Sequence, residues 1–85
     1  MQQHNLVLFT SPQLGQILQA SRKAKKLSQT QLAKRLVLSQ SRVSHLEKNP
    51  EQLSFAQLIK WCAVLGLELS VGLRKSPAEQ VATDW

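Results

Sequence analysis

The stretch LSQTQLAKRLVLSQSRVSHL, residues 27–46, has the pattern of two short helices joined by a sharp turn. Ser28 stands just before an apolar-periodic run, where its hydroxyl can cap the first turn of a helix. Leu32, Ala33 and Leu36 then fall on one face of a helix of about two turns. The pattern therefore predicts a short amphipathic helix that begins after Ser28.

A second helix is predicted after Ser39, which is another cap residue. Val43 and Leu46 are spaced to face inward. At about 100° per residue the opposite face is short, polar and basic, as a surface that enters the major groove of DNA must be. Its members are Ser41, Ser44, His45 and Lys48, with Gln40 and Arg42 on the flanks.

The two helices resemble the helix-turn-helix of phage-repressor and Cro-like regulators. The matching residues are Ser28-Gln29-x-x-Leu32-Ala33 and Ser39-Gln40-x-x-Val43-Ser44-x-Leu46-Glu47, within a match over residues 14–65. The resemblance implies a mostly α domain of four to five helices that binds DNA through the second of these two helices.

We divide the polar residues of this unit by the part of the DNA that they are expected to contact. Those on the exposed N-terminal turns of the second helix are expected to reach base edges: Gln40, Ser41, Ser44 and His45. Contacts to phosphates, which position the protein, are assigned to Gln29, Lys34, Arg35, Ser39, Arg42 and Lys48.

One residue departs from the family pattern. The resemblance implies Gly in the turn between the two helices, because glycine adopts positive φ without a Cβ penalty. This chain has Val37 there. Either the turn avoids positive φ or the site is strained.

Positive charge is concentrated on this part of the chain. The net charge is +6. Residues 11–50 hold eight Lys and Arg (22, 23, 25, 26, 34, 35, 42, 48) against one acid, Glu47, whereas residues 51–85 hold three bases and four acids. Such a local excess is typical of nucleic-acid binding. For the basic residues 22, 23, 25 and 26, helix-dipole stabilisation and phosphate contact remain equally good interpretations.

The sequence gives no indication of catalysis or of a cofactor. It has no Cys/His cluster with zinc spacing, no Gly-rich phosphate loop and no paired acids, so we predict neither an enzyme nor a metal site. The single cysteine, Cys62, lies on an apolar helix face and is predicted to be a core residue. No apolar run approaches the roughly 18 residues of a membrane span, and no secretory signal is visible, which predicts a cytoplasmic protein.

We expect four segments along the chain: an N-terminal arm (1–10), the helical domain (11–66), a strand (67–74) and a flexible tail (75–85). Ser11-Pro12 is a helix-start signal, and Ser54 is expected to cap a last helix over 55–65. The buried stripe of that helix is predicted to be Phe55, Leu58, Ile59, Cys62 and Leu65. Trp61 falls beside this stripe and is expected to be partly exposed or to contact a partner subunit.

The strand is predicted from a change of period. Leu67, Leu69, Val71 and Leu73 alternate with small or polar residues, which favours a half-buried strand. It can pair with residues 6–9 or with its own copy in a second subunit. We predict the second arrangement, so these four residues form a homodimer interface.

The second half of the chain is similar to the HipB-type antitoxins. The Leu67-Glu68-Leu69-Ser70 segment, the polar tail and the Asp84-Trp85 ending carry this resemblance. It implies a dimer that binds operator DNA, represses its own operon and holds a HipA-type kinase toxin inactive, with Trp85 as a candidate anchor for that partner. Two alternatives are a stand-alone repressor and a pure protein-interaction module.

Overall fold

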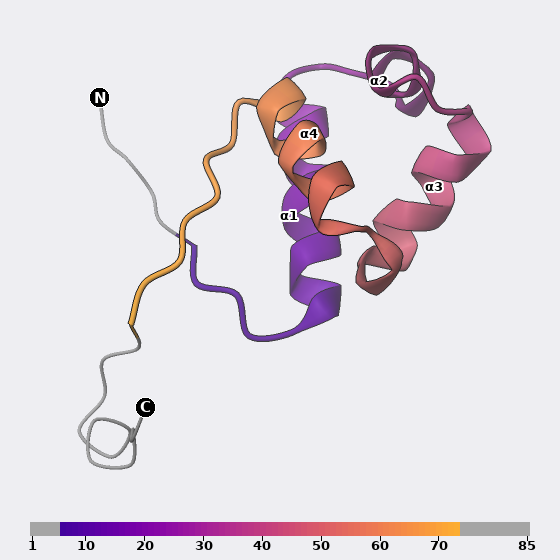
Figure 1. Cartoon of the computed structure of the whole chain (residues 1–85). Helices are drawn as coiled ribbons and strands as arrows, with labels where there is room; N and C mark the ends of the chain where they lie inside the picture. Colours follow the sequence, from indigo (N-terminus) through magenta and orange to yellow (C-terminus); the bar gives the residue numbers. More distant parts are fainter. Residues whose placement is uncertain (1–5, 74–85) are drawn as a thin grey trace.

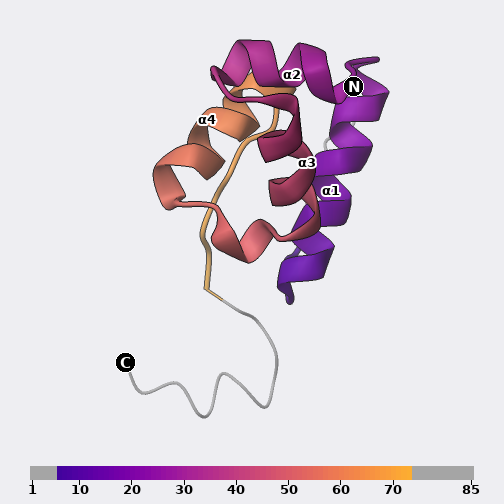
Figure 2. The same cartoon turned by 90° about the vertical axis from the view of Figure 1, so that its right-hand side faces the viewer.

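The structure, a computed structural model, describes residues 6–73. Its elements are α1 (Ser11–Ala24), α2 (Gln29–Leu36), α3 (Gln40–Lys48), a 3-10 turn η1 (Pro50–Gln52) and α4 (Phe55–Leu65) (Figure 1). In Figure 2, α3 lies at the front between α1 and α4, and α2 crosses above it. The predicted mostly α architecture is confirmed.

Helix starts follow the predicted capping residues with one exception. The hydroxyls of Ser28, Ser39 and Ser54 each accept a hydrogen bond from the backbone N–H three residues further on, at 3.0, 3.1 and 3.0 Å. At α1 the N-cap is Thr10 rather than Ser11, which is already helical. Thr10 is the cap because its hydroxyl accepts a hydrogen bond, at 3.3 Å, from the backbone N–H of Gln13, which has no partner within the helix.

The core gathers one apolar face from each helix. Its largest fully buried side chains are Leu18, Leu32, Val43, Leu46 and Trp61. Cys62 is buried as predicted, and burial raises the pKa of its thiol, which keeps it protonated. No helix of the described residues is long and apolar enough to cross a membrane.

The helices α1 and α3 approach each other closely at Gly15. A Cβ at this position would lie 2.5 Å from the backbone carbonyl oxygen of Glu47. Only a residue without a side chain fits there, so Gly15 allows the contact that brings the C-terminal end of α3 against α1.

The buried face of α4 differs from the predicted one. Trp61 is fully buried, whereas Phe55 is 72% exposed and Ile59 is exposed as well. The predictions for these three residues were wrong. The buried stripe is turned about the helix axis by roughly one residue, because the indole, as the larger side chain, fills the space against the other helices.

The predicted C-terminal strand is also absent from the described residues. Residues 67–73 have no strand pairing with residues 6–9 or with any other part of the described chain. Leu67 packs partly buried against the core, while Val71 and Leu73 are exposed. A strand needs a neighbouring strand for its backbone groups, and within residues 6–73 this protomer supplies none. Residue 74 and the tail lie outside the described residues.

The turn between α2 and α3 places Val37 at positive φ, which is the strained one of the two alternatives expected from the sequence. Val37 has φ 59° and ψ 46°, the left-handed conformation that the family fills with glycine. The amide of Leu38 bonds to the carbonyl of Ala33 at 2.9 Å, and that of Val37 to Lys34 at 3.3 Å, which closes the turn as a Schellman motif. The Val37 side chain is 82% exposed, so little packing compensates for the strain.

Replacing Val37 by Gly should therefore stabilise the protein. The left-handed conformation costs a non-glycine residue about 1–2 kcal/mol, and glycine loses about 0.4–1 kcal/mol through the unfolded state. We expect a net rise of roughly 0.5–1 kcal/mol in the free energy of unfolding, measured by urea denaturation. Val37→Ala, which keeps a Cβ, is the matched control and should gain less. A Val37→Gly variant no more stable than Val37→Ala would show that the turn is not strained.

Candidate nucleic-acid interface

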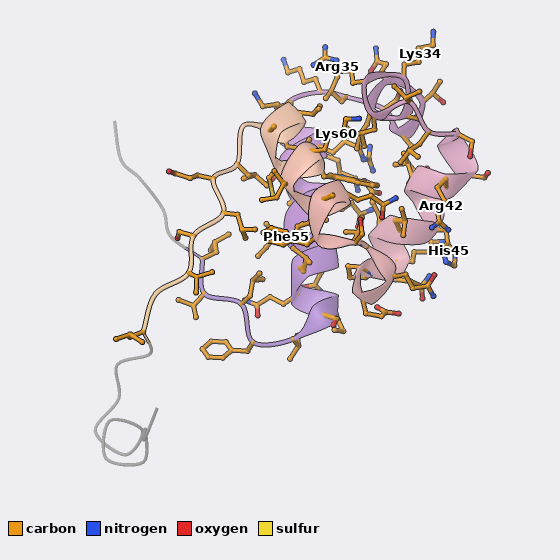
Figure 3. All side chains as sticks on the ribbon, in the orientation of Figure 1. Lys34, Arg35, Arg42, His45, Phe55 and Lys60 are labelled. Atoms are coloured by element: carbon orange, nitrogen blue, oxygen red, sulfur yellow. The ribbon has the colours of Figure 1, made fainter. Side chains whose placement is uncertain are left out.

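The outer face of α3 presents most of the residues predicted to contact DNA. Gln40, Ser41, Arg42 and Lys48 are exposed along it, and Ser44 is half-buried. Figure 3 shows Arg42 and His45 pointing outward together from this helix. The inner face of the same helix carries the buried Val43 and Leu46, so the helix is fixed to the core while its polar face remains open.

Two serines at the start of α3 have partners within the protein. The Ser39 hydroxyl accepts from the backbone amide of Arg42 at 3.1 Å and lies 3.2 Å from the hydroxyl of Ser41. Ser39 thus holds the first turn of α3 in place. The Ser41 contact uses either the Ser39 proton or its second lone pair, and when Ser41 donates, the Ser39 proton is left for a phosphate oxygen.

His45 is held at the other end of the face. Its Nε2 lies 2.8 Å from the Oε1 atom of Gln52 in η1, and the side-chain amide of Asn49 donates to the His45 carbonyl oxygen at 3.0 Å. The ring is exposed and its position is set by the turn that follows α3.

Gln29 and Gln40, predicted for phosphate and base, are in direct contact. The Nε2 of Gln40 donates to the Oε1 of Gln29 at 2.6 Å, and the Nε2 of Gln29 donates to the Oε1 of Glu47 at 3.1 Å. Thus the first residues of α2 and α3 share one hydrogen-bonded chain, which reaches inward to a carboxylate.

That carboxylate belongs to a buried ion pair that sequence reasoning missed. The Nε of Arg22 donates to Glu47 Oε2 at 2.7 Å, and its Nη2 donates to Oε1 at 3.2 Å. Arg22 is therefore not available for phosphate, one of the two roles considered for it. A signal was present: Arg22 and Glu47 each lie four residues after a buried apolar residue, Leu18 and Val43.

The remaining predicted phosphate contacts lie apart from the face of α3. Lys34 and Arg35 are exposed in the last turn of α2. Figure 3 places them at the α2 end of the molecule, toward Lys60 of α4 and away from Arg42 and His45. The structure thus joins Gln29 with the α3 residues in one surface, and it leaves the two α2 bases apart from that surface.

The comparisons with known proteins agree with this geometry. A model of the helix-turn-helix family matches residues 18–71. The chain belongs to the helix-turn-helix family. Helix-turn-helix domains bind DNA by placing the second helix of the motif in the major groove. In this helix-turn-helix protein, α3 is the second helix of the motif, and the resemblance to repressor-like regulators is confirmed.

Solved structures show the same fold over most of the chain. A chain in the structure of a HipA-HipB-O2-O3 complex has a TM-score of 0.74 and 22% identity, and the match covers 84% of this chain and 100% of that one. A chain in a HipB-O1-O2 complex has a TM-score of 0.71 and 22% identity, covering 80% and 99%. No curated protein matches the sequence. The two structural matches show that the described fold is that of the matched chains in these HipB complexes.

Proposed function

We propose that the protein is a sequence-specific transcriptional repressor that binds operator DNA as a homodimer and acts as the antitoxin of a HipA-type kinase. The observation that carries the DNA-binding part is the open polar face of α3. The helix is capped by Ser39 and anchored by Val43 and Leu46, so this face is rigid before DNA arrives. Preorganised groups lose little conformational freedom on binding.

In this proposal α3 enters the major groove, and the contacts keep the division made from the sequence. Base edges are read by Gln40, Ser41, Ser44 and His45. Phosphates are held by Gln29, Lys34, Arg35, Ser39, Arg42 and Lys48. The net charge of +6, concentrated in residues 11–50, supplies the electrostatic attraction that such contacts use.

Replacing Gln40 by Ala tests the assignment of α3. On a site selected by the wild-type protein from random duplexes, the variant should lose about 1–3 kcal/mol of binding free energy, and much less on random DNA. Lys48→Gln is the control, because loss of a phosphate contact should weaken both sites alike. The measurement is a fluorescence-anisotropy titration at fixed salt. Equal losses for Gln40→Ala on both sites would remove Gln40 from base reading.

The same titration, repeated at several salt concentrations, distinguishes the remaining function classes. Affinity that falls steeply with salt supports DNA binding, because bound phosphates release counterions. Absence of any salt-dependent DNA binding would instead favour a pure protein-interaction module.

The antitoxin part of the proposal concerns a protein partner. It is supported by the likeness of the fold to a chain in a HipA–HipB–DNA complex and by the resemblance of the Asp84-Trp85 pair to the HipB-type antitoxins. Trp85 lies outside the described residues and stays a prediction. Large aromatic side chains provide much of the binding energy when they anchor in a partner's pocket.

Deleting residues 82–85 should weaken binding to a purified HipA-type kinase by about 30-fold or more and leave DNA affinity unchanged, because an anchoring Trp is worth at least about 2 kcal/mol. Calorimetry on the protein pair measures the first quantity and anisotropy the second. Truncated and full-length chains that bind the kinase equally would place the contact on the folded body. Absence of kinase binding by either chain would favour the stand-alone repressor.

A further inference from the structure

The starting point is the buried carboxylate of Glu47. Its side chain is only 3% exposed, and that of Arg22 is 8% exposed. Arg22 holds both carboxylate oxygens, and its Nη1 donates to the Leu27 carbonyl oxygen at 2.9 Å. The guanidinium is thus locked from two sides, and the carboxylate that it holds cannot turn.

An ionised carboxylate only accepts hydrogen bonds. The residue that faces Oε1 of Glu47 must therefore present a donor. Gln29 does so with its Nε2, at 3.1 Å. Because an amide group is planar, with nitrogen and oxygen on opposite branches, the Oε1 of Gln29 is turned away from Glu47.

The orientation of Gln29 in turn sets the orientation of Gln40. The exposed oxygen of Gln29 only accepts, so Gln40 must approach it with its Nε2, and this contact is 2.6 Å. The amide of Gln40 is then fixed in one of its two orientations. It offers its Oε1 as an acceptor, and the second hydrogen on Nε2 as a donor, on the exposed face of α3.

We propose that Glu47 is a specificity-determining positioning residue, which sets the amide orientation of Gln40 through Gln29. The inference rests on the proposed base-reading role of Gln40 and names what that residue prefers. Adenine presents N7 as an acceptor and the N6 amino group as a donor, which matches an amide with a fixed oxygen and hydrogen. Guanine presents acceptors at both N7 and O6, so its O6 faces the oxygen of Gln40 and is rejected.

Two variants remove the orienting contact in different ways. Gln29→Met breaks the chain while leaving the Arg22–Glu47 pair intact. The double variant Arg22→Met/Glu47→Leu replaces the pair by apolar side chains of similar volume, an exchange that a fold commonly tolerates. Thermal unfolding by circular dichroism confirms that each variant is folded before DNA is added.

The measurement is the ratio of affinities for two duplexes, one with adenine and one with guanine at the position that Gln40→Ala shows to be read by Gln40. The wild type should prefer adenine by at least about fivefold. Both variants should lower this ratio by about twofold or more, because a Gln40 amide that is free to turn loses conformational freedom when it pairs with adenine and can move its oxygen away from the O6 of guanine. Gln57→Ala, which breaks the capping box of α4 and none of these contacts, should keep the wild-type ratio.

A second readout needs no DNA. In the free protein, the side-chain amide proton shifts of Gln40 should change in Gln29→Met and in the double variant, and stay unchanged in Gln57→Ala. If the two variants are folded and keep the wild-type adenine/guanine ratio, the inference is overturned while base reading by Gln40 stands. If Gln40→Ala itself leaves the base preference unchanged at every position of the site, base reading by Gln40 and the inference both fail, even where the amide shifts respond.

Discussion

Replacing Glu47 by Leu alone should lower the free energy of unfolding by about 3–5 kcal/mol, because Arg22 is then left as an unpaired charge in the core. The Arg22 side chain is 8% exposed, so water cannot compensate for the lost carboxylate. A change of this size is a large fraction of the stability of a small domain, roughly 5–15 kcal/mol. The measurement is the urea midpoint at neutral pH.

Two controls separate the charge from the packing. The double variant Arg22→Met/Glu47→Leu should recover most of the loss, since it removes both charges together. Glu51→Leu, at an exposed glutamate in η1, should change the stability by no more than about 0.5 kcal/mol. If the double variant is as unstable as Glu47→Leu, the pair contributes through shape rather than through charge compensation.

Local signals in the sequence predicted the helix starts and the buried face of α3 well. The caps at Ser28, Ser39 and Ser54 were predictable because each depends only on residues within one turn of the chain. Val43 and Leu46 were assigned to the core by spacing alone and are fully buried. What these signals share is short range, so no other element of the fold has to be known.

The errors come from interactions between distant elements. On α4, two stripes a residue apart both follow the helical period, and only the positions of the other helices decide that Trp61 is inside and Phe55 outside. The Arg22–Glu47 pair joins residues 25 positions apart. The predicted strand failed for the same reason, because pairing depends on a neighbour that no periodicity reveals.

A homodimer remains the proposal for the apolar surface that one protomer leaves uncovered. Val71 is 97% exposed, and Leu73, Phe55 and Ile59 are exposed as well. Two copies with a net charge of +6 repel each other, so they must meet where Lys and Arg are scarce. Residues 67–73 contain no basic side chain and one acid, Glu68, which suits contact between two copies over these seven residues, and Arg74 and Lys75 follow directly.

Changing Val71 and Leu73 to Lys should convert the dimer to a monomer, because four added charges would be buried in one two-fold interface. Both side chains are exposed in the protomer, so its own stability should be unaffected. Operator affinity should fall by about 100-fold or more, since two linked half-site contacts become separate events. Sedimentation velocity reports the mass and anisotropy the affinity, with Phe55→Lys/Ile59→Lys as the comparison that tests the exposed side of α4. If the 71/73 variant stays dimeric while the 55/59 variant becomes monomeric, the interface lies on α4 instead of on residues 67–73.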